Sequence, residues 1–357
     1  MSAAEKYLVT RLLKWNTDSN DRQMPWKGEK DPYRIWLSEI ILQQTRVEQG
    51  WNYYNRFIEA FPNIKALAKA PETTVFKLWE GLGYYSRCKN LIATAKFIAE
   101  NNKGKFPDTY EDIVALKGVG PYTAAAIASF AYNLPHAVVD GNVFRVLSRY
   151  FGIDTPIDSV AGKKLFTGLA NKLLDVKQPG IYNQALMDFG AVICKPKLPL
   201  CSTCPLNSKC VAYLTGYVDK LPVKEKSIIK KTRWFYFLRI TYADKVYVRK
   251  RTESDIWQNL YEFVLLENDG PVENITTVES FKNVFGSIKF NITRVSQVYR
   301  QQLTHQTIHG QFISITINKP LALKGYQPVS PGELALLPFP KFITHYLSDK
   351  NVSLNLF

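Results

Sequence analysis

The sequence predicts two folded domains, an all-α domain over residues 1–217 and a smaller α+β domain over residues 232–357. Apolar residues recur at helical spacing throughout the first region, and strand-like alternation replaces this spacing after Lys231. The stretch between them, residues 218–231, is charged and contains proline, which is typical of an interdomain linker. A chain of 357 residues with 46% hydrophobic content is large enough for two separate cores.

The helical spacing divides the first domain into segments. Start and stop signals such as Asp31-Pro32 and Phe106-Pro107-Asp108 separate several of them. The predicted helical segments are residues 35–47, 74–79, 91–98, 124–130, 143–150 and 165–174.

The second domain begins with two predicted strands, residues 234–240 and 245–249, which pair around the turn at Tyr242-Ala243-Asp244. Residues 311–317 alternate between polar and apolar side chains, as a half-buried strand does. The tail, residues 331–347, is predicted to be helical. The mixture defines a compact α+β domain without internal repeats.

The formal net charge of +15 indicates a polyanion as partner, and nucleic acid is the commonest polyanion in cells. A generally basic surface would give the same charge. The first fifteen residues contain no long apolar run, and no stretch approaches the ~20 apolar residues that span a bilayer. We therefore expect a soluble, cytoplasmic protein without a signal peptide.

A two-glycine turn lies between two predicted helices, in the run Leu116-Lys117-Gly118-Val119-Gly120-Pro121. Proline is favoured at the first position of a helix, and glycine lets the backbone approach a ligand closely. The free N–H groups of the second helix suit a phosphate. An ordinary tight turn between helices is the alternative, but the charge favours a helix-hairpin-helix that holds the DNA backbone without reading its sequence.

Two carboxylates occupy contrasting positions. Asp140 stands where an apolar run meets a helix, so it is either an ordinary N-cap or a carboxylate with a lowered pKa that stays ionised beside a developing cation. Glu39 lies inside an apolar helix, where it either faces solvent or is buried with a raised pKa as a proton donor. One protonated and one ionised carboxyl group are what glycosidic-bond cleavage requires.

Four of the five cysteines, Cys194, Cys201, Cys204 and Cys210, fall within one short stretch, whereas Cys88 is isolated. An odd count without a secretory signal argues against disulfides. Zinc sites show two close Cys pairs or a Cys and a His pair, but only one C-x2-C pair occurs and no His lies between 137 and 304. An all-thiolate iron–sulfur cluster accepts such spacing. The spacing alone leaves zinc and an iron–sulfur cluster both open, and the neighbouring motifs favour the cluster.

Together these motifs resemble the endonuclease III superfamily of helix-hairpin-helix DNA glycosylases, and within it the MutY-type adenine DNA glycosylases. The resemblance covers residues 25–210 in order. It is carried by Pro25-Trp26, Asp31-Pro32-Tyr33, Ser38-Glu39, Gln43-Gln44-Thr45, Gly81-Leu82-Gly83-Tyr84-Tyr85-Ser86-Arg87, Val119-Gly120-Pro121-Tyr122-Thr123-Ala124, Val139-Asp140-Gly141-Asn142, Asn183-Gln184-Ala185-Leu186 and the four cysteines. It implies two helical lobes with the active site between them and a [4Fe-4S] cluster on the four cysteines.

The resemblance implies a monomeric enzyme of base excision repair that removes adenine mispaired with 8-oxoguanine or guanine in duplex DNA, after the base has been flipped out. Glu39 would protonate the adenine and Asp140 would stabilise the oxocarbenium-like sugar. Asn142 would orient Asp140, and Tyr122 would share the pocket. The DNA contacts would come from Gln44 and Tyr84, which wedge into the duplex, and from Gly118, Val119 and Gly120. Without the resemblance, Gln44 could be an ordinary residue on a helix surface, and Tyr84 could simply pack in the core.

Tyr122 bears on the reaction type. Bifunctional relatives carry a lysine at this place, which forms a Schiff base with the sugar and cuts the strand, and a phenol cannot do so. The resemblance therefore implies a monofunctional glycosylase. A bifunctional glycosylase–lyase is the first competing function, and a non-enzymatic iron–sulfur DNA-binding protein is the second.

The second domain resembles the Nudix-like C-terminal domain of the same enzymes, with Arg251 to Leu266, including Trp257 to Phe263, as the matching segment. The dense Glu cluster of a catalytic Nudix box is absent from the sequence, so recognition without pyrophosphate hydrolysis is expected. Leu303, Thr304 and His305 match the loop that reads 8-oxoguanine in the family, although many relatives have Phe at the place of Leu303. His309 is a rival to His305.

Overall fold

The computed structural model describes residues 1–225 and 230–349, and these residues divide between two compact units. One unit contains Met1–Lys69 and Lys89–Lys226, and the other contains Ala70–Cys88 and Ser227–Phe357. The first is helical and the second holds a sheet with a few short helices, so the predicted fold class is confirmed. The predicted domain limits differ from these units, because the segment Ala70–Cys88 groups with the sheet unit.

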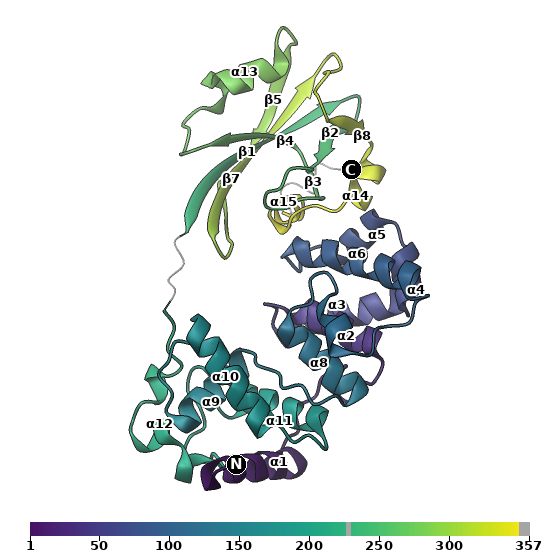
Figure 1. Ribbon diagram of the computed structural model, residues 1–357. Coiled ribbons are helices and arrows are strands. Elements are labelled where there is room, and N and C mark those ends of the chain that lie inside the picture. Colours follow the sequence, from purple (N-terminus) through teal and green to yellow (C-terminus); the bar gives the residue numbers. More distant parts are fainter. Residues whose placement is uncertain (226–229, 350–357) are drawn as a thin grey trace. The chain divides into compact units, whose positions relative to one another are not determined.

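The helical unit packs around the long helix α11, whose contacts reach α1, α8 and α9 (Figure 1). A second group of contacts joins α2 to α3 and α8, and α7 to α8. The helices of this unit are α1 (Ala3–Asp18), α2 (Pro32–Leu42), α3 (Val47–Ala60), α4 (Ile64–Lys69), α6 (Tyr85–Asn101, whose first turn belongs to the other unit), α7 (Tyr110–Val114), α8 (Pro121–Tyr132), α9 (Gly141–Phe151), α10 (Val160–Leu173), α11 (Pro179–Val192) and α12 (Val211–Leu214), with short 3-10 turns at Asn207–Lys209 and Val218–Lys220.

The core of this unit explains why α1 and α11 are held together. Trp15 of α1 meets Phe189 of α11 edge-on, with ring centroids 5.1 Å apart. Leu12 and Leu8, one and two turns before Trp15, are fully buried in the same cluster. Burying a large apolar side chain contributes roughly 1.5–3 kcal/mol, so this seam anchors the N-terminal helix.

The helix predicted over residues 35–47 is wrong at its end, because the chain forms two helices there. α2 ends at Leu42 and α3 begins at Val47. Between them Gln44 adopts a left-handed backbone with φ of 55°, which is uncommon for a residue other than glycine. The apolar spacing continued across this break and hid it. The other helical segments predicted in this domain lie within observed helices, except that the segment 165–174 extends one residue beyond α10, which ends at Leu173.

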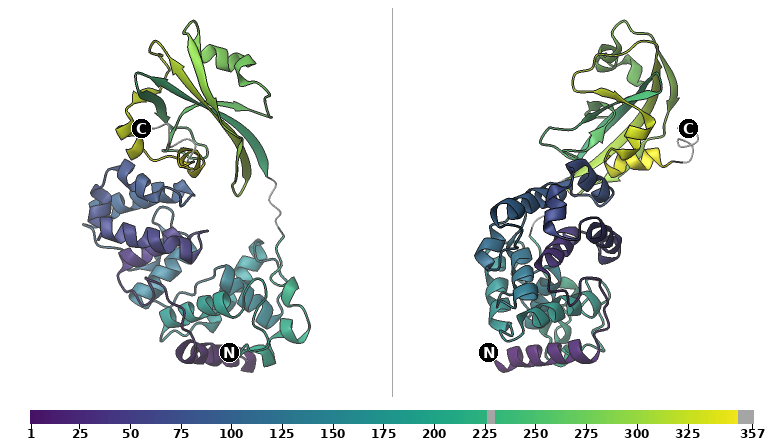
Figure 2. Two further views of the ribbon diagram at one scale, coloured as in Figure 1. Left: turned by 180° about the vertical axis from the view of Figure 1, so that it is seen from behind. Right: turned by 90° about the vertical axis from the view of Figure 1, so that its right-hand side faces the viewer.

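The sheet unit is built on β1 and β7, which pair in parallel over eleven positions (Figure 2). The described strands form one sheet in the order β3-β2-β1-β7-β5, with β4 paired to β1, β6 to β7 and β8 to β2. Their bounds are β1 (Lys231–Tyr242), β2 (Lys245–Lys250), β3 (Tyr261–Glu262), β4 (Val264–Asn268), β5 (Phe290–Val295), β6 (Tyr299–Gln302), β7 (Gln306–Ile317) and β8 (Gln327–Val329). The predicted pairing of the first two strands and the predicted strand at 311–317 are confirmed.

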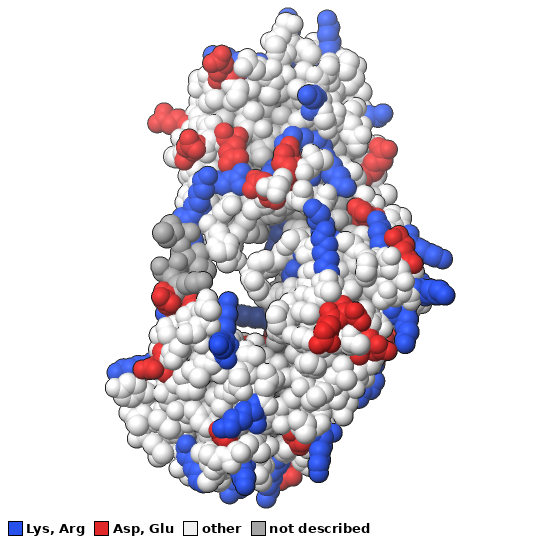
Figure 3. All heavy atoms as spheres, in the orientation of Figure 1, with Lys and Arg blue, Asp and Glu red and all other residues white. Residues whose placement is uncertain are grey.

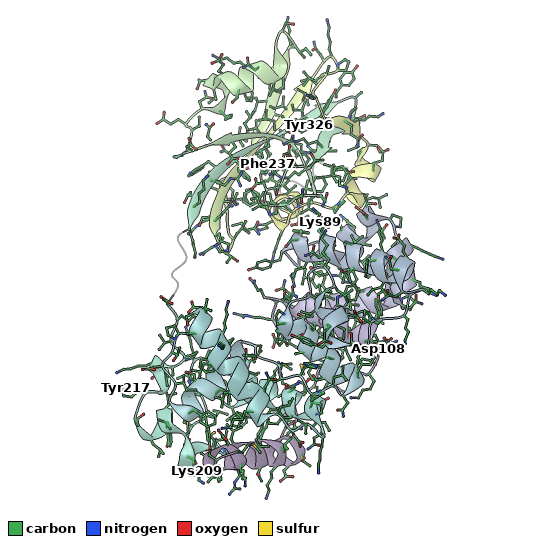
Figure 4. The ribbon with its side chains drawn as sticks, viewed as in Figure 1. Lys89, Asp108, Lys209, Tyr217, Phe237 and Tyr326 are labelled. Atoms are coloured by element: carbon green, nitrogen blue, oxygen red, sulfur yellow. The ribbon has the colours of Figure 1, made fainter. Side chains whose placement is uncertain are left out.

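Helices cover both faces of this sheet. Phe281 and Phe285 of α13 (Glu279–Phe285) pack with Tyr236 and Leu238 on one face. On the other face Phe237 of β1, labelled in Figure 4, packs against Phe342 of α15 (Lys341–Leu347), with ring centroids 6.1 Å apart. The segment predicted as one helix over 331–347 is two helices, α14 (Pro331–Leu336) and α15, because Pro338 and Pro340 interrupt it. The unit also includes α5 (Glu72–Trp79) and a 3-10 turn at Ile275–Thr277.

The first part of the predicted linker packs against the helical unit. Arg149 Nε donates to the carbonyl oxygen of Leu221 at 3.0 Å, and the Ile157 amide donates to Val223 O at 3.0 Å. The remainder of the linker includes residues 226–229, which lie outside the described residues, as do residues 350–357 of the predicted second domain. Among the described helices, none is long and apolar enough to cross a membrane.

Candidate active site

A cavity of about 360 Å³ in the helical unit collects the residues singled out for chemistry. Its wall includes Glu39 from α2, Tyr122 from the start of α8, and Asp140 and Asn142 at the start of α9. A cavity of this volume is in the range that binds small organic groups. Two carboxyl groups about a hundred residues apart in sequence therefore share one hollow.

Glu39 is buried, with 6% of its surface exposed, because its helix is apolar on both sides of it. The pKa of the Glu39 carboxyl is raised to about 7, chiefly by burial; a hydrogen bond from Tyr122 acts in the opposite direction, and the nearby charge of Asp140 acts in the same direction as burial. The carboxyl group is therefore half protonated near neutral pH, as a general acid should be. The solvent-facing alternative for Glu39 is excluded.

Asp140 is the N-cap of α9 and also faces the cavity. Its Oδ1 accepts hydrogen bonds from the backbone amides of Asn142 and Val143 at 2.9 and 2.8 Å, and its Oδ2 accepts one from Asn142 Nδ2 at 2.7 Å. The predicted lowering of its pKa is wrong, because burial raises the pKa more strongly than these three hydrogen bonds lower it. The bonds fix the orientation of the carboxylate, and one of them comes from the side chain of Asn142, the residue that the resemblance implied for this role.

Tyr122 is held beside both carboxyl groups and remains a neutral phenol. Burial, followed by the charges of Glu39 and Asp140, raises its pKa well above the ordinary value. Its hydroxyl hydrogen-bonds to Glu39 and also lies 3.5 Å from Met187 Sδ of α11. A neutral hydroxyl in this position donates to the glutamate and offers no amine.

Arg145 extends the site toward the cysteine loop, and sequence analysis missed it. It lies on α9 with 9% of its surface exposed. Its Nη2 donates to Asn142 Oδ1 at 2.8 Å and to Gly190 O at 2.7 Å, and its Nε donates to Cys194 O at 2.7 Å. An arginine flanked by Phe144 and Val146 was the available signal, because a guanidinium there is buried only when it has partners.

Close packing of α9 and α11 brings Asn142 next to Gly190, so the side chain of Arg145 reaches both. A side chain added at Gly190 would place its Cβ 2.6 Å from Asn142 Cβ and 3.0 Å from Asn142 O. Real Cβ atoms do not approach other atoms so closely, so only glycine lets the two helices meet here.

Asn183 of α11 holds the segment that leads to Asp140. Its Oδ1 accepts a hydrogen bond from the Val138 amide at 3.2 Å, and its Nδ2 donates to His136 O at 2.8 Å.

The four clustered cysteines line one small cavity next to α9 and α12. The buried Arg149 lies 3.5 Å from Cys194 Sγ, and the Leu206 amide donates to Cys204 Sγ at 3.4 Å. Burial raises the pKa of the Cys204 thiol to about 12, and the hydrogen bond from Leu206 acts in the opposite direction. Hydrogen bonds to sulfur are typical around iron–sulfur clusters. No three His, Cys, Asp or Glu side chains in the described residues are arranged to hold a metal ion. The four thiols and the donors beside them fit the ligand set of a cluster.

The glycine turn has the geometry of a hairpin between α7 and α8. Gly118 adopts a φ of 80° beside Asn90, and Gly120 is the N-cap of α8 with Pro121 at the first helical position. Both glycines are exposed, so their backbone can approach a phosphate. The Val119 side chain is buried with 7% exposure, which leaves only its backbone for such a contact.

Gln44 and Tyr84 share an unusual backbone. Both adopt a left-handed conformation, with φ of 55° and 48°, and both are exposed. Such strain costs about 1–3 kcal/mol per residue and gathers at functional positions. Tyr84 is therefore not a core residue, and Gln44 lies in the turn between α2 and α3 rather than on a helix. The Tyr84 hydroxyl is 2.5 Å from Thr304 Oγ1 within the sheet unit.

Leu303, Thr304 and His305 form the tip of the hairpin between β6 and β7. The Leu303 amide donates to Gln306 O at 2.7 Å, and the Lys231 amide donates to His305 O at 3.0 Å. The His305 side chain is exposed. The rival His309 lies inside β7 and stacks on Trp234 with ring centroids 4.5 Å apart. The two histidines thus occupy different settings, one at a loop tip and one on a strand.

Positively charged side chains occur on both units, and on the face drawn in Figure 3 they are mixed with Asp and Glu. Near the cysteine loop, Lys209 lies over the Tyr7 ring at 4.5 Å, and Figure 4 shows it beside α1. Contacts to phosphate therefore have to be assigned residue by residue.

Two family models match the chain. Residues 37–171 match the HhH-GPD superfamily of base excision DNA repair proteins, and residues 235–349 match the NUDIX domain. The adenine DNA glycosylase of Buchnera aphidicola subsp. Baizongia pistaciae is 35% identical over 317 residues, which cover 86% of this chain and 86% of that protein. The chain belongs to the adenine DNA glycosylase family. It is therefore a DNA glycosylase, an enzyme that hydrolyses N-glycosidic bonds, and the resemblance identified from its motifs is confirmed.

Solved structures agree with the fold of the helical part of this glycosylase. A thermostable thymine-DNA glycosylase is 30% identical, covers 59% of this chain and 97% of its own, and gives a TM-score of 0.55. An endonuclease III in a non-covalent complex with DNA covers 60% of this chain and 99% of its own at 19% identity, with a TM-score of 0.51. The second likeness concerns the fold alone.

Removing one cysteine of the quartet tests the proposed metal loop of the glycosylase. We expect Cys204→Ser to abolish the iron and sulfide content of the purified protein and to lower its melting temperature, because a metal centre stabilises the loop that holds it. Cys88→Ala is the matched control, since Cys88 is fully buried away from the quartet and should leave the iron content unchanged. Metal analysis and thermal unfolding measure both effects. Zinc in place of iron, or full iron content in the serine variant, would contradict the assignment.

Proposed function

We propose that this glycosylase removes adenine mispaired with 8-oxoguanine or guanine in duplex DNA and leaves an abasic site without cutting the strand. The observation that carries the proposal is the shared cavity of Glu39 and Asp140, in which one carboxyl group is half protonated near neutral pH and the other is held by three hydrogen bonds. Adenine is proposed as the base that is removed because the Buchnera relative is named an adenine DNA glycosylase.

The chemistry follows from the two carboxyl groups. Glu39 donates a proton to the adenine ring, so the base leaves as a neutral molecule. The bond between sugar and base breaks as positive charge develops on the sugar, and Asp140 stabilises that charge. Asn142 keeps the Asp140 carboxylate in place through its amide, and Arg145 fixes Asn142 in turn. Water then adds to the sugar and loses a proton, which restores the Glu39 carboxyl group, and the product is the abasic site.

Tyr122 supports a monofunctional reaction. A lyase step needs an amine that attacks the sugar and forms an imine, and a phenol with a raised pKa provides none. The phenol instead donates a hydrogen bond to Glu39 as the proton is delivered. Strand cleavage at the abasic site should therefore require added alkali.

The decisive experiment is single-turnover base release from duplexes that carry adenine opposite 8-oxoguanine, guanine or cytosine, with and without alkali. We expect release opposite 8-oxoguanine and guanine, and strand breaks only after alkali treatment. Efficient strand breaks without alkali, together with a borohydride-trapped adduct, would show the competing glycosylase–lyase. Binding without any base release would indicate a non-enzymatic DNA-binding protein.

DNA binding is assigned to several elements of the chain. Gly118, Val119 and Gly120 would meet the phosphate backbone through their amides, while Gln44 and Tyr84 would wedge into the duplex. Leu303, Thr304 and His305 would read the 8-oxoguanine. The four cysteines Cys194, Cys201, Cys204 and Cys210 would hold a [4Fe-4S] cluster, whose contribution is to fold the loop that bears Lys195, Lys197 and Lys209. The protein would act as a cytoplasmic monomer.

The loop assignment predicts a selective defect. We expect His305→Ala to lower the preference for 8-oxoguanine over guanine opposite adenine by roughly tenfold, the size of one hydrogen bond, with little change in release opposite guanine. His309→Ala is the control and should keep the preference, because its ring is stacked on Trp234. Single-turnover rates on both duplexes give the ratio. Equal loss on both duplexes would count against the assignment.

A further inference from the structure

The turn that carries Tyr84 follows α5 directly and has an unusual backbone. The C-cap of α5 is Glu80. Three of the next four residues, Gly81, Gly83 and Tyr84, are left-handed, with φ of 90°, 80° and 48°. A left-handed tyrosine persists only where its surroundings fix it, because the conformation is uncommon outside glycine. The contacts around this turn therefore decide where the Tyr84 ring lies.

Side chains close by in sequence give the turn its shape. Trp79 Nε1 and Arg87 Nη2 both donate to Gly83 O, at 3.0 and 3.2 Å. The Arg87 guanidinium lies over the Trp79 ring at 5.1 Å and over the Tyr84 ring at 5.4 Å. These contacts belong to the same short segment as the turn and would move with it, so its place in the unit has to be fixed by other contacts.

Two side chains at the end of α5 supply such contacts to the loop between α14 and α15. Glu80 Oε1 accepts a hydrogen bond from the Phe339 amide at 2.9 Å. Lys77 Nζ donates to Leu337 O at 3.0 Å. Glu80 Oε2 and Lys77 Nζ are themselves paired at 2.9 Å, and the Glu80 side chain is only 18% exposed. Both bonds to the loop are charge-assisted, and such bonds are stronger than neutral ones.

The loop between α14 and α15 is itself fixed to the sheet. The Tyr261 amide of β3 donates to Pro338 O at 2.9 Å, and Phe339 is buried with 1% of its surface exposed. At the other end of the turn, the Tyr84 hydroxyl lies 2.5 Å from Thr304 Oγ1 in the hairpin between β6 and β7. The turn is thus attached to the sheet at its start by this loop and at its end by the hairpin.

We propose that Glu80 is a positioning residue that anchors the Tyr84 turn to the loop between α14 and α15, so that the turn keeps its place when Tyr84 enters the duplex. This inference rests on the proposed wedge role of Tyr84. Extruding a base requires unstacking, which the neighbouring base pairs oppose. A turn that is attached at one end only would swing away under that resistance. Glu80 touches no reacting atom, and its effect on base release passes through Tyr84.

The test measures adenine release under single turnover from a duplex that carries adenine opposite 8-oxoguanine. Glu80→Ala removes the acceptor for the Phe339 amide, and we expect release to slow by roughly tenfold, the size of one hydrogen bond to a charged group. Glu80→Gln keeps an acceptor oxygen and should retain most of the rate. Asp108→Ala is the matched control, because Asp108 also pairs with a lysine three residues away, Lys105, and takes no part in this contact. It should leave the rate unchanged.

A double variant separates positioning from a general loss of structure. If Glu80 acts through Tyr84, adding Glu80→Ala to Tyr84→Ala should cause no further slowing, because both changes act on one contact. Effects that multiply in the double variant would overturn the inference. So would an unchanged rate in Glu80→Ala, or a Glu80→Gln variant that is as slow as Glu80→Ala.

Lys77→Met keeps the inference testable if Glu80→Ala does not fold. It removes the bond to Leu337 O, and it should slow release in the unmodified background but not in Tyr84→Ala. A rate that Lys77→Met leaves unchanged, or lowers equally in both backgrounds, would overturn the inference. Full-rate release by Tyr84→Ala would instead refute the wedge role, and absence of adenine release by the unmodified enzyme would refute the proposed activity.

Discussion

Replacing Glu39 by Gln is expected to slow adenine release by roughly 10²–10⁴-fold, the usual contribution of a general acid, while duplex binding is retained. The variant keeps the size of the side chain and removes only the proton that it donates. Single-turnover rates and a binding titration on the same duplex separate chemistry from affinity. Glu48→Gln, an exposed position in the first turn of α3, controls for the lost charge and should have no effect.

The pH dependence of the unmodified enzyme gives an independent check on Glu39. Because its pKa is raised to about 7, the protonated form dominates below that pH and falls tenfold for each unit above it. The rate constant for base release should therefore decline as pH rises through about 7. This limb should vanish from the residual activity of Glu39→Gln. A rate that is flat from pH 6 to 9 would exclude Glu39 as the acid.

The second large effect is expected at Asp140. Asp140→Asn removes the negative charge that stabilises the developing cation, and we expect base release to slow by at least roughly 10²–10³-fold, the loss seen when one electrostatic stabiliser is removed. Asparagine is as good an N-cap as aspartate, so α9 and the melting temperature should be preserved. Asp140→Ser, which also caps, should be equally inactive and equally stable.

The Asp140→Asn variant should also lower the pKa of Glu39. The charge of Asp140 raises the pKa of Glu39, so its removal lowers that pKa. The alkaline limb of the residual activity in Asp140→Asn should therefore move to lower pH. An asparagine variant that keeps its rate, or that unfolds, would contradict the assigned role.

The sequence predicted what depends on local pattern. The two-glycine turn was recognisable because glycine and proline have fixed conformational roles, and it lies between α7 and α8 as expected. The family and the fold class followed from motifs that retain their order along the chain, and both are confirmed by the comparisons. The sharing of one cavity by Glu39 and Asp140 could only be supposed, since periodicity says nothing about distant helices.

The features that the sequence did not predict depend on opposing effects on a pKa and on contacts between residues that are distant in sequence. The pKa of Asp140 is set by burial against three hydrogen bonds, and the extent of burial is a property of the folded chain. Arg145 and Arg149 looked like ordinary charged residues because their partners are distant in sequence. The break at Gln44 was missed because the apolar spacing continues across it.

Because Gly190 has no side chain, this position limits the substitutions that the enzyme can tolerate. One added methyl group would push α9 from α11, and the displacement would reach Asn142 on one side and the start of the cysteine loop, through Arg145 and Cys194, on the other. Gly190→Ala would thus mimic an active-site lesion and a cofactor lesion at once, although it touches no reacting atom. Variants that lose repair are therefore to be sought along this helix contact as well as around the base.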